Sequence, residues 1–189
     1  MLVLIGPSAS GKTESAKIMI NRYPISRVVT CTTRKKRINE IDGFDYHFLS
    51  KTKFLQLKKD GFFLETALYN NNFYGTPKNE LGDNKFIILE PQGLQSFLEK
   101  SDCQIVAIFL KTKESTRIKR MKIRKDHPDD IKKRIKADRE EFNLKKISGL
   151  DLIIDTNDVT LSELADKIYF NYLEILEKKK LCGKQLSLF

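Results

Sequence analysis

The residues GPSASGKT, positions 6–13, constrain the fold of this chain more than any other feature. They match the pattern GxxxxGK[ST] and follow the apolar run Leu2–Ile5, which is typical of a buried strand. In such a loop, glycines let consecutive backbone N–H groups converge on a phosphate, and the helix that follows adds partial positive charge. The pattern predicts a nucleoside triphosphate site. The alternative is an ordinary strand–turn–helix that matches by chance.

Two side chains of this loop have the chemistry for phosphoryl transfer. Lys12 can reach the β and γ phosphates and is a candidate catalytic residue, and the Thr13 hydroxyl is a candidate ligand for Mg²⁺ bound with the triphosphate. The candidate triphosphate-binding residues are Gly6, Pro7, Ser8, Ala9, Ser10, Gly11, Lys12 and Thr13.

Apolar, strand-like runs alternate with helix-like segments over most of the chain. Besides Leu2–Ile5, such runs occupy residues 86–90, 103–110 and 150–155. Helical spacing marks residues 13–22, 92–100, 114–125, 128–146 and 160–178, and the last of these begins with a capping box of Thr160 and Glu163. Buried strands that alternate with helices indicate an α/β fold with a parallel sheet covered on both faces.

A polar, strand-prone block between about residues 30 and 77 interrupts this alternation. The strand candidate RVVTC (residues 27–31) leads into it, and it contains a helix that begins at Ser50 and two strands between residues 62 and 74 joined by a turn at NNN. We interpret the block as a lobe inserted into a single domain of residues 1–180. Residues 181–189 are predicted to form a short tail.

The charge of the chain favours an anionic partner but excludes little. Lysine and arginine number 35 against 25 acidic residues, a formal net charge of +10 that solubility alone can also explain. Three widely spaced cysteines, Cys31, Cys103 and Cys182, indicate reduced thiols. Because no signal-peptide pattern and no apolar stretch of roughly 18 residues is found, we expect a cytoplasmic protein without a membrane partner.

The segment TTRKKRINEIDGFDYHF, residues 32–48, is a candidate second phosphate site. Arginine presents a planar fork that binds two phosphate oxygens, and a tyrosine hydroxyl adds a donor, so Arg34, Arg37 and Tyr46 suit a phosphate. Glu40 would then hold the arginines in place. The alternative is a solvated basic loop with an internal salt bridge.

The same segment resembles the monophosphate-binding segment of guanylate kinases, in which T-T-R-x-x-R-x-x-E-x-x-G-x-x-Y-x-F recurs. Further matches follow in order: GFFLETALYNNNFYGTP resembles the family's G-x-F-L-E…Y-G-T run, ILEPQG its acid-x-Gln-Gly element and RMKIR its lid arginines. The resemblance covers roughly residues 2–175. It implies a P-loop NTPase core with a parallel sheet, an inserted monophosphate-binding lobe at about residues 30–77 and a helical lid at about residues 117–140.

The resemblance also implies an activity, the phosphorylation of GMP or dGMP by ATP with Mg²⁺. Carried over by position, the GMP-binding residues are Thr30, Arg34, Arg37, Glu40, Tyr46, Glu65, Tyr74, Thr76 and Glu90. The catalytic lid arginines are Arg120, Arg124 and Arg134. Glu65 is expected to read guanine, whose N1–H and exocyclic NH₂ are adjacent donors that adenine does not present.

Three positions depart from the family pattern. Ala9 replaces a glycine and fits only if the backbone there needs no positive φ. Ile88 and Glu90 stand where the family usually has two aspartates, so the first of the acids that would orient metal-bound water is missing. These changes leave two alternatives open, a catalytically weak guanylate kinase-like binding module and a kinase of a different phosphorylated small molecule.

The last five residues, QLSLF, resemble the short peptide with which bacterial replication proteins bind the sliding clamp. Such a tail can dock apolar anchors in a groove of a partner. We favour the interpretation that these residues form a frayed tail or tuck against the domain.

Overall fold

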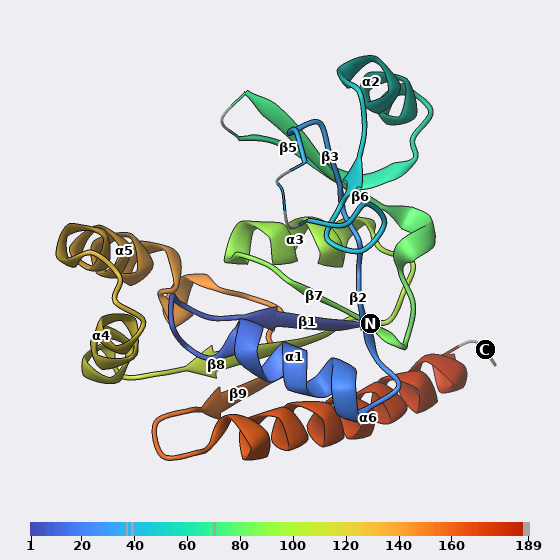
Figure 1. Cartoon of the computed structure of the whole chain (residues 1–189). Coiled ribbons are helices and arrows are strands. Elements are labelled where there is room, and N and C mark those ends of the chain that lie inside the picture. The colour runs from blue at the N-terminus through green and yellow to red at the C-terminus, as the bar shows by residue number, and fades with distance from the viewer. Residues whose placement is uncertain (37, 39, 70, 187–189) are drawn as a thin grey trace.

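A parallel sheet of five strands forms the centre of the molecule (Figure 1). The structure is a computed structural model of the chain, and it describes residues 1–36, 38, 40–69 and 71–186. Across the sheet the strands are β2 (Ser26–Arg27), β7 (Lys85–Ile88), β1 (Leu2–Ile5), β8 (Val106–Lys111) and β9 (Leu152–Asp155), and each pair of neighbours is parallel. The predicted α/β fold with a parallel sheet is confirmed.

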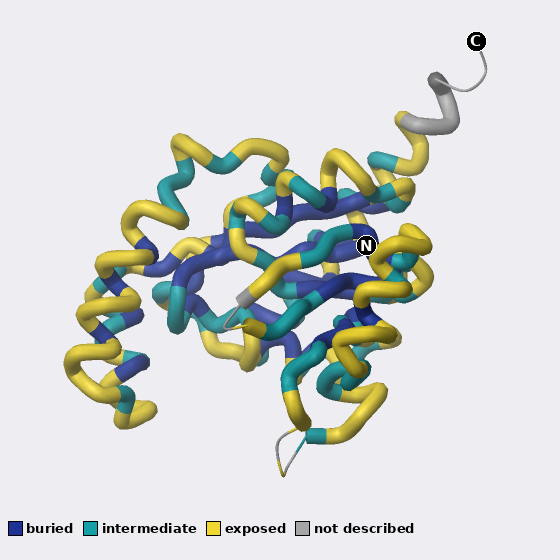
Figure 2. Tube along the Cα trace, turned by 90° about the horizontal axis from the view of Figure 1, so that it is seen from above, coloured by how far each residue is buried: buried dark blue, intermediate teal, exposed yellow. Residues whose placement is uncertain are grey.

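Helices cover both faces of this sheet, and the alternating side chains of β1 show why. Leu2 and Leu4 pack with α1 (Lys12–Arg22) and α6 (Leu161–Leu186) on one face. Val3 and Ile5 pack with α3 (Pro91–Lys100) on the other. Figure 2 shows the consequence, a buried set of central strands enclosed by helices with exposed outer faces. The first strand therefore lies in two cores at once, which anchors the loop that follows it.

The last helix begins as predicted and ends later. At its N-terminus the Thr160 N–H donates to Glu163 Oε2 at 2.9 Å and the Glu163 N–H donates to Thr160 Oγ1 at 3.2 Å, so the capping box is formed. The helix continues to Leu186, beyond residue 180 where the sequence predicts a tail. Of the QLSLF segment, residues 187–189 lie outside the described residues, and its contact with a sliding clamp stays a prediction.

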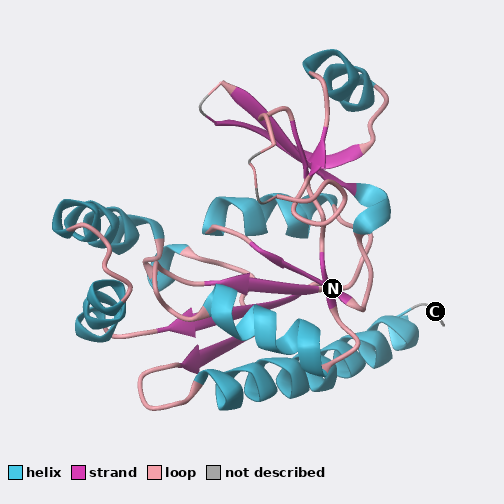
Figure 3. Ribbon diagram, in the orientation of Figure 1, coloured by secondary structure: helices cyan, strands magenta, loops and turns pink. Residues whose placement is uncertain are grey.

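A second sheet of four strands stands apart from the first (Figure 3). Its order is β4 (His47–Phe48), β3 (Cys31–Thr32), β6 (Asn72–Pro77) and β5 (Phe63–Tyr69). The helix α2 (Lys51–Lys59) packs on it through Phe54, whose ring stacks on Phe63 with centroids 4.5 Å apart. The Ser50 hydroxyl caps this helix by accepting the Lys53 N–H, as the serine start predicts. These elements belong to the predicted inserted lobe.

The prediction of a single strand over RVVTC, residues 27–31, is wrong. The first residue, Arg27, ends β2 of the central sheet, the last residue, Cys31, begins β3 of the second sheet, and residues 28–30 lie in neither strand. The reason lies in two apolar residues: Val28 is buried in the core beneath α3, whereas Cys31 is buried in the small core of the second sheet. The chain must cross from one core to the other between them, so it cannot remain one strand.

Two helices, α4 (Glu114–Ile123) and α5 (Pro128–Glu141), form the predicted lid segment. Met121, Ile131 and Ile135 pack these helices together. The helix α5 is shorter than the predicted span of residues 128–146, because Phe142 leaves the helix to pack in the core near Phe109. Short 3-10 turns occupy Lys78–Glu80 and Leu144–Lys146. Within the described part of the chain, every helix is too short or too polar to cross a membrane.

Candidate active site

The glycine-rich loop lies at the carboxyl end of β1, between its sheet neighbours β7 and β8. Ligands of open α/β sheets bind at this edge, where the strand order reverses. Gly6 is required there: its φ is +151°, and a Cβ at this position would lie 2.6 Å from the Leu110 carbonyl oxygen. Gly11 has a φ of +104° and leads directly into α1, whose first N–H groups have no partner within the helix.

The condition that the backbone at Ala9 needs no positive φ is not met. The φ of Ala9 is +61°, in the left-handed region, where a residue other than glycine costs about 1–2 kcal/mol. Its methyl group, however, packs on the cluster of Met121, Ile131 and Ile135 from α4 and α5. Full burial of one such group contributes about 0.8 kcal/mol, and Ala9 is partly buried, so packing against the two helices offsets part of the backbone strain.

Lys12 lies folded onto the loop in this structure. Its Nζ donates to the carbonyl oxygens of Gly6 and Pro7, the latter at 2.9 Å, and it lies 5.8 Å from the centroid of the Phe142 ring. Burial lowers the pKa of Lys12 to about 8, while the carboxylates of Asp138 and Glu90 act in the opposite direction. The ammonium group is therefore poorly hydrated and close to two carboxylates, an arrangement in which a phosphate is a strong competing ligand.

A cavity of about 1060 Å³ joins the loop to the second sheet. It is lined by residues of the loop, of β5 and β6, of the segment after β7, and of α5. The predicted site residues among its lining are Gly6, Ser8, Lys12, Glu65, Tyr74, Glu90 and Arg134. Residues predicted from four separate segments of the sequence thus share one cavity.

Glu65 is oriented by its neighbour across the second sheet. The register of β5 and β6 places Glu65 opposite Thr76, and the Thr76 hydroxyl donates to Glu65 Oε1 at 2.8 Å. Thr76 is 1% exposed, so this hydroxyl is fixed in the protein interior, whereas Glu65 lines the cavity. A carboxylate oxygen can accept further bonds, and Glu65 can therefore receive two donors from a ligand in the cavity.

Glu40 and Arg34 form a two-bond ion pair beside the cavity. The Arg34 guanidinium donates to Glu40 Oε1 at 2.6 Å and to Glu40 Oε2 at 3.0 Å, and it lies 5.4 Å from the centroid of the Tyr46 ring. The rings of Tyr46 and Tyr74 are 6.1 Å apart, which links this cluster to the cavity. A polar cluster with fixed donors is thus present next to Tyr74.

Two predicted GMP-binding residues, Arg37 and Thr30, are not placed in the main cavity or in the cluster of Arg34, Glu40 and Tyr46 by the described structure. Arg37 lies outside the described residues. Thr30 is absent from the described lining of the main cavity, and its carbonyl oxygen accepts the His47 N–H at 2.9 Å where the second sheet begins. Their roles stay predictions from the resemblance.

A second, smaller cavity of about 280 Å³ borders the other part of the loop. It is lined by residues 9–14 together with Arg120, Ile123, Arg124 and Leu161, so Thr13 opens into this cavity. Lys12 lines both cavities, which makes it the described residue at which they meet. A triphosphate wrapped in the loop can therefore have its base in the smaller cavity and its terminal phosphate in the larger one.

Arg120 is the predicted lid arginine that contacts the loop. It donates to the Ala9 carbonyl oxygen at 3.2 Å and to the Thr156 carbonyl oxygen at 2.7 Å. Thr156 is fully buried at the end of β9, and its hydroxyl donates to the Ser10 carbonyl oxygen at 3.2 Å. Arg120 thus joins α4, the loop and the sheet.

The other two predicted lid arginines share one carboxylate. Arg124 donates to Asp126 Oδ2 at 2.8 Å and Arg134 donates to the same oxygen at 3.3 Å. Both arginines are half exposed, and both border a cavity, Arg124 the smaller and Arg134 the larger. Asp126 therefore holds two cations that a triphosphate would also attract.

Replacing Asp126 with asparagine is expected to lower the KM for a nucleoside triphosphate about two- to fivefold. The exposed pairs contribute only about 0.2–1 kcal/mol each, and their loss frees two arginines for the phosphates. Steady-state titration of ATP at saturating acceptor measures the change. Asp130→Asn removes the same charge from an exposed position at the start of α5 and should leave KM unaltered. A KM at or above the wild-type value in Asp126→Asn would contradict the role given to Asp126.

Two buried charged residues at the loop, Arg117 and Asp138, were not predicted from the sequence. Arg117 is 5% exposed and Asp138 is 6% exposed, and the two are paired. A signal was available in the spacing. Asp138 follows Ile131 and Ile135 on one face of α5, and Arg117 precedes Met121 by one turn of α4, so both lie on the apolar faces of their helices.

Comparisons with known proteins point to one family. A family model described as guanylate kinase matches residues 1–170. The chain is 34% identical over 176 residues to a guanylate kinase of Mycoplasma genitalium, covering 87% of this chain and 72% of that protein. It is 30% identical over 188 residues to a guanylate kinase of Wolbachia pipientis wMel, covering 95% and 94% of the two chains.

Solved structures give the same result for the fold. The crystal structure of a guanylate kinase from Anaplasma phagocytophilum matches with a TM-score of 0.63 and 26% identity, covering 93% of this chain and 84% of that one. A gluconokinase from Sinorhizobium meliloti 1021 matches with a TM-score of 0.54 and 14% identity, covering 95% of each chain, and that likeness concerns the fold alone.

Proposed function

This chain belongs to the guanylate kinase family, and we propose on this basis that it transfers the γ-phosphoryl group of ATP to GMP, forming ADP and GDP. One observation carries the proposal: Lys12 of the phosphate-binding loop and Glu65 of the second sheet line the same cavity of about 1060 Å³. A group that binds the terminal phosphate of ATP and a group suited to guanine thus face a common space.

In this proposal GMP lies in the larger cavity with its base at Glu65. The carboxylate accepts the N1–H and the exocyclic NH₂ of guanine, while Thr76 holds one of its oxygens in place. Adenine offers no such pair of donors, and a carboxylate left without partners would penalise its binding. Arg34, Tyr46 and Tyr74 bind the phosphate of GMP, with Arg37 as a further predicted donor.

The transfer itself requires positioning and charge neutralisation. An oxygen of the GMP phosphate attacks the γ-phosphorus in line, and the bond to the oxygen between the β- and γ-phosphorus breaks, which leaves ADP. No general base is needed because the attacking oxygen is already anionic. Lys12 and the arginines of α4 and α5, Arg120, Arg124 and Arg134, stabilise the negative charge spread over the transferred group. Closure of the lobe and the lid over both substrates excludes water, which would otherwise hydrolyse ATP.

The residues present fit a magnesium ion held mainly by the nucleotide. The Thr13 hydroxyl lines the smaller cavity and the Glu90 carboxylate lines the larger one, and both are oxygen ligands of the kind Mg²⁺ prefers. An ion bound in this way would take most of its ligands from phosphates and water. When bound, Mg²⁺ would neutralise charge on the β- and γ-phosphates.

A steady-state screen of nucleoside monophosphates with ATP tests the proposal. We expect GMP to have the highest kcat/KM, dGMP to follow, and AMP, CMP and UMP to be poor acceptors, with activity lost when EDTA removes Mg²⁺. A preference for AMP, or no product from any nucleotide, would refute it. The second result would instead favour a binding module, and a different phosphorylated acceptor would be the next class to test.

A further inference from the structure

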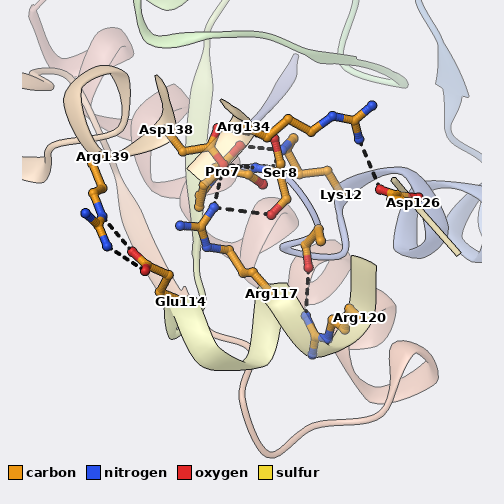
Figure 4. A network of polar contacts seen from close by, with 12 residues as sticks. Pro7, Ser8, Lys12, Glu114, Arg117, Arg120, Asp126, Arg134, Asp138 and Arg139 are labelled. Carbon is orange, nitrogen blue, oxygen red and sulfur yellow. Dashed lines mark hydrogen bonds and ion pairs between the residues drawn. The ribbon is translucent and has the colours of Figure 1, made fainter. Parts of the chain in front are cut away.

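A buried ion pair joins the phosphate-binding loop to the lid helices (Figure 4). Arg117 of α4 donates to Asp138 Oδ2 of α5 at 2.5 Å. The same carboxylate accepts two hydrogen bonds from Ser8 of the loop, from the backbone N–H at 3.0 Å and from the hydroxyl at 3.2 Å. Arg117 also lies 3.4 Å from the Ser8 carbonyl oxygen. A single loop residue is therefore held on both sides of its backbone by two helices.

Stability alone does not explain this pair. Desolvation of two charges costs about as much as their attraction returns, and an apolar pair of similar volume is often as stable. Among the described residues, Arg117 Nε is buried without a hydrogen-bond partner, which adds to the cost. What the pair provides in addition is a fixed acceptor for the Ser8 peptide. The pair is therefore best explained by the position in which it holds Ser8.

We propose that Asp138, held by Arg117, is a positioning residue for ATP, because it fixes the Ser8 peptide and ties the phosphate-binding loop to α4 and α5. The inference rests on the proposed function and deepens it. With the Ser8 N–H directed to Asp138, the loop has a defined course from Gly6 to the start of α1. The N–H groups at the start of that helix then face the phosphates in a fixed arrangement.

Two further contacts join the same parts of the molecule. The Ala9 methyl group packs on Met121, Ile131 and Ile135, and Arg120 donates to the Ala9 carbonyl oxygen. Both contacts involve the residue next to Ser8, so three attachments lie within a short stretch of the loop. The helices that carry the lid arginines are thereby set relative to the phosphates by the loop itself.

The position of Asp138 also makes Arg117 necessary. Asp138 lines the main cavity beside Lys12, where an uncompensated carboxylate would repel the phosphates of ATP. Arg117 neutralises this charge and keeps the carboxylate turned toward Ser8. We therefore expect Arg117→Met to weaken ATP binding more than Asp138→Ala does, because only the former leaves an unpaired acid next to the nucleotide.

Three variants separate positioning from stability: Asp138→Ala, Arg117→Met and the double variant Arg117→Met/Asp138→Ala. Each single variant leaves one buried charge unpaired and should lower Tm, and the double variant should recover much of that loss. If Asp138 positions the loop, the double variant should still raise the KM for ATP by about tenfold, while the KM for GMP stays within about twofold. Binding of a fluorescent ATP analogue without GMP gives the same comparison independently of kinase activity.

The chain provides a matched control in Glu114 and Arg139. This pair also bridges α4 and α5, through two hydrogen bonds of 2.9 and 2.7 Å, but it is exposed and lies away from Ser8 (Figure 4). The double variant Glu114→Ala/Arg139→Ala should leave Tm, the KM for ATP and analogue binding nearly unchanged.

The outcomes distinguish this proposal from the proposed function. If the double variant Arg117→Met/Asp138→Ala binds the ATP analogue as the wild type does, Asp138 is structural and the positioning role is wrong. An equal rise in the KM values for ATP and GMP would also overturn it, because the effect would then not be confined to the loop. If instead the wild type binds the analogue but does not phosphorylate GMP, the kinase assignment fails, and the analogue measurement still decides the role of Asp138.

Discussion

Replacing Lys12 with alanine is expected to lower kcat for GDP formation by at least about 10²–10³-fold, the usual effect of removing one preorganised charged donor from a transition state. Lys12 is the described residue shared by the two cavities, and it lies between the loop and the space in which the acceptor phosphate would bind. Alanine removes the ammonium group and leaves the backbone of the loop in place. Single-turnover kinetics with ATP and GMP measures the loss of the chemical step.

The control for this experiment is Lys17→Ala on the same helix. Lys17 is exposed, pairs with Glu14 at 2.9 Å and is absent from the described lining of both cavities, so its loss removes the same charge from α1 without removing a side chain that lines either cavity. Binding of GMP should be retained in Lys12→Ala, because the predicted GMP-binding residues other than Glu90 lie in the second sheet and its loops. A Lys12→Ala variant that keeps most of the wild-type kcat would remove the loop lysine from the proposed mechanism.

The substitution Glu65→Gln is expected to lower kcat/KM for GMP by about 10²- to 10³-fold, because it weakens or removes two charge-assisted hydrogen bonds to guanine. The glutamine side chain has nearly the same shape and can still accept the Thr76 hydroxyl, but its NH₂ group opposes one guanine donor. The KM for ATP should change little, because Glu65 is absent from the described lining of the smaller cavity, in which the base of ATP is proposed to lie.

The comparison that decides this prediction is the ratio of kcat/KM for GMP to that for AMP. In Glu65→Gln this ratio should fall sharply, whereas in Glu99→Gln, an exposed glutamate of α3 that pairs with Gln95, it should equal the wild-type ratio. A Glu65→Gln variant that discriminates as well as the wild type would show that another group reads the base.

Local patterns in the sequence predicted most of the fold because the interactions involved are short in range. The loop after Leu2–Ile5 requires glycines for close approach, and that need is visible in eight residues. The start of α6 is likewise set by a reciprocal pair of hydrogen bonds between Thr160 and Glu163. The end of α5 was not predictable in this way, since the helical pattern continues beyond Glu141 and the core near Phe109 decides where Phe142 turns inward.

The residues of the site were predictable where a short motif marks them, and not where contacts between distant segments decide their position. Glu65 and Arg34 were found through motifs. The contact of Arg117 with Asp138 joins two helices that are rich in charged residues, and their composition does not show that these two side chains are buried. A helix rich in lysine and arginine gives no direct sign of which charge points inward. The apolar spacing of Ile131 and Ile135 provides that sign only when it is extended to the polar residue on the same face.

The meeting of the two cavities at Lys12 has a consequence for the order of substrate binding. If the adenine half of ATP and the whole of GMP occupy separate chambers joined at one side chain, neither nucleotide blocks the entrance used by the other. Each can then arrive first, and each product can depart while its counterpart stays bound. We therefore expect a random order of substrate binding and product release, without any change in the chemistry between the two phosphates.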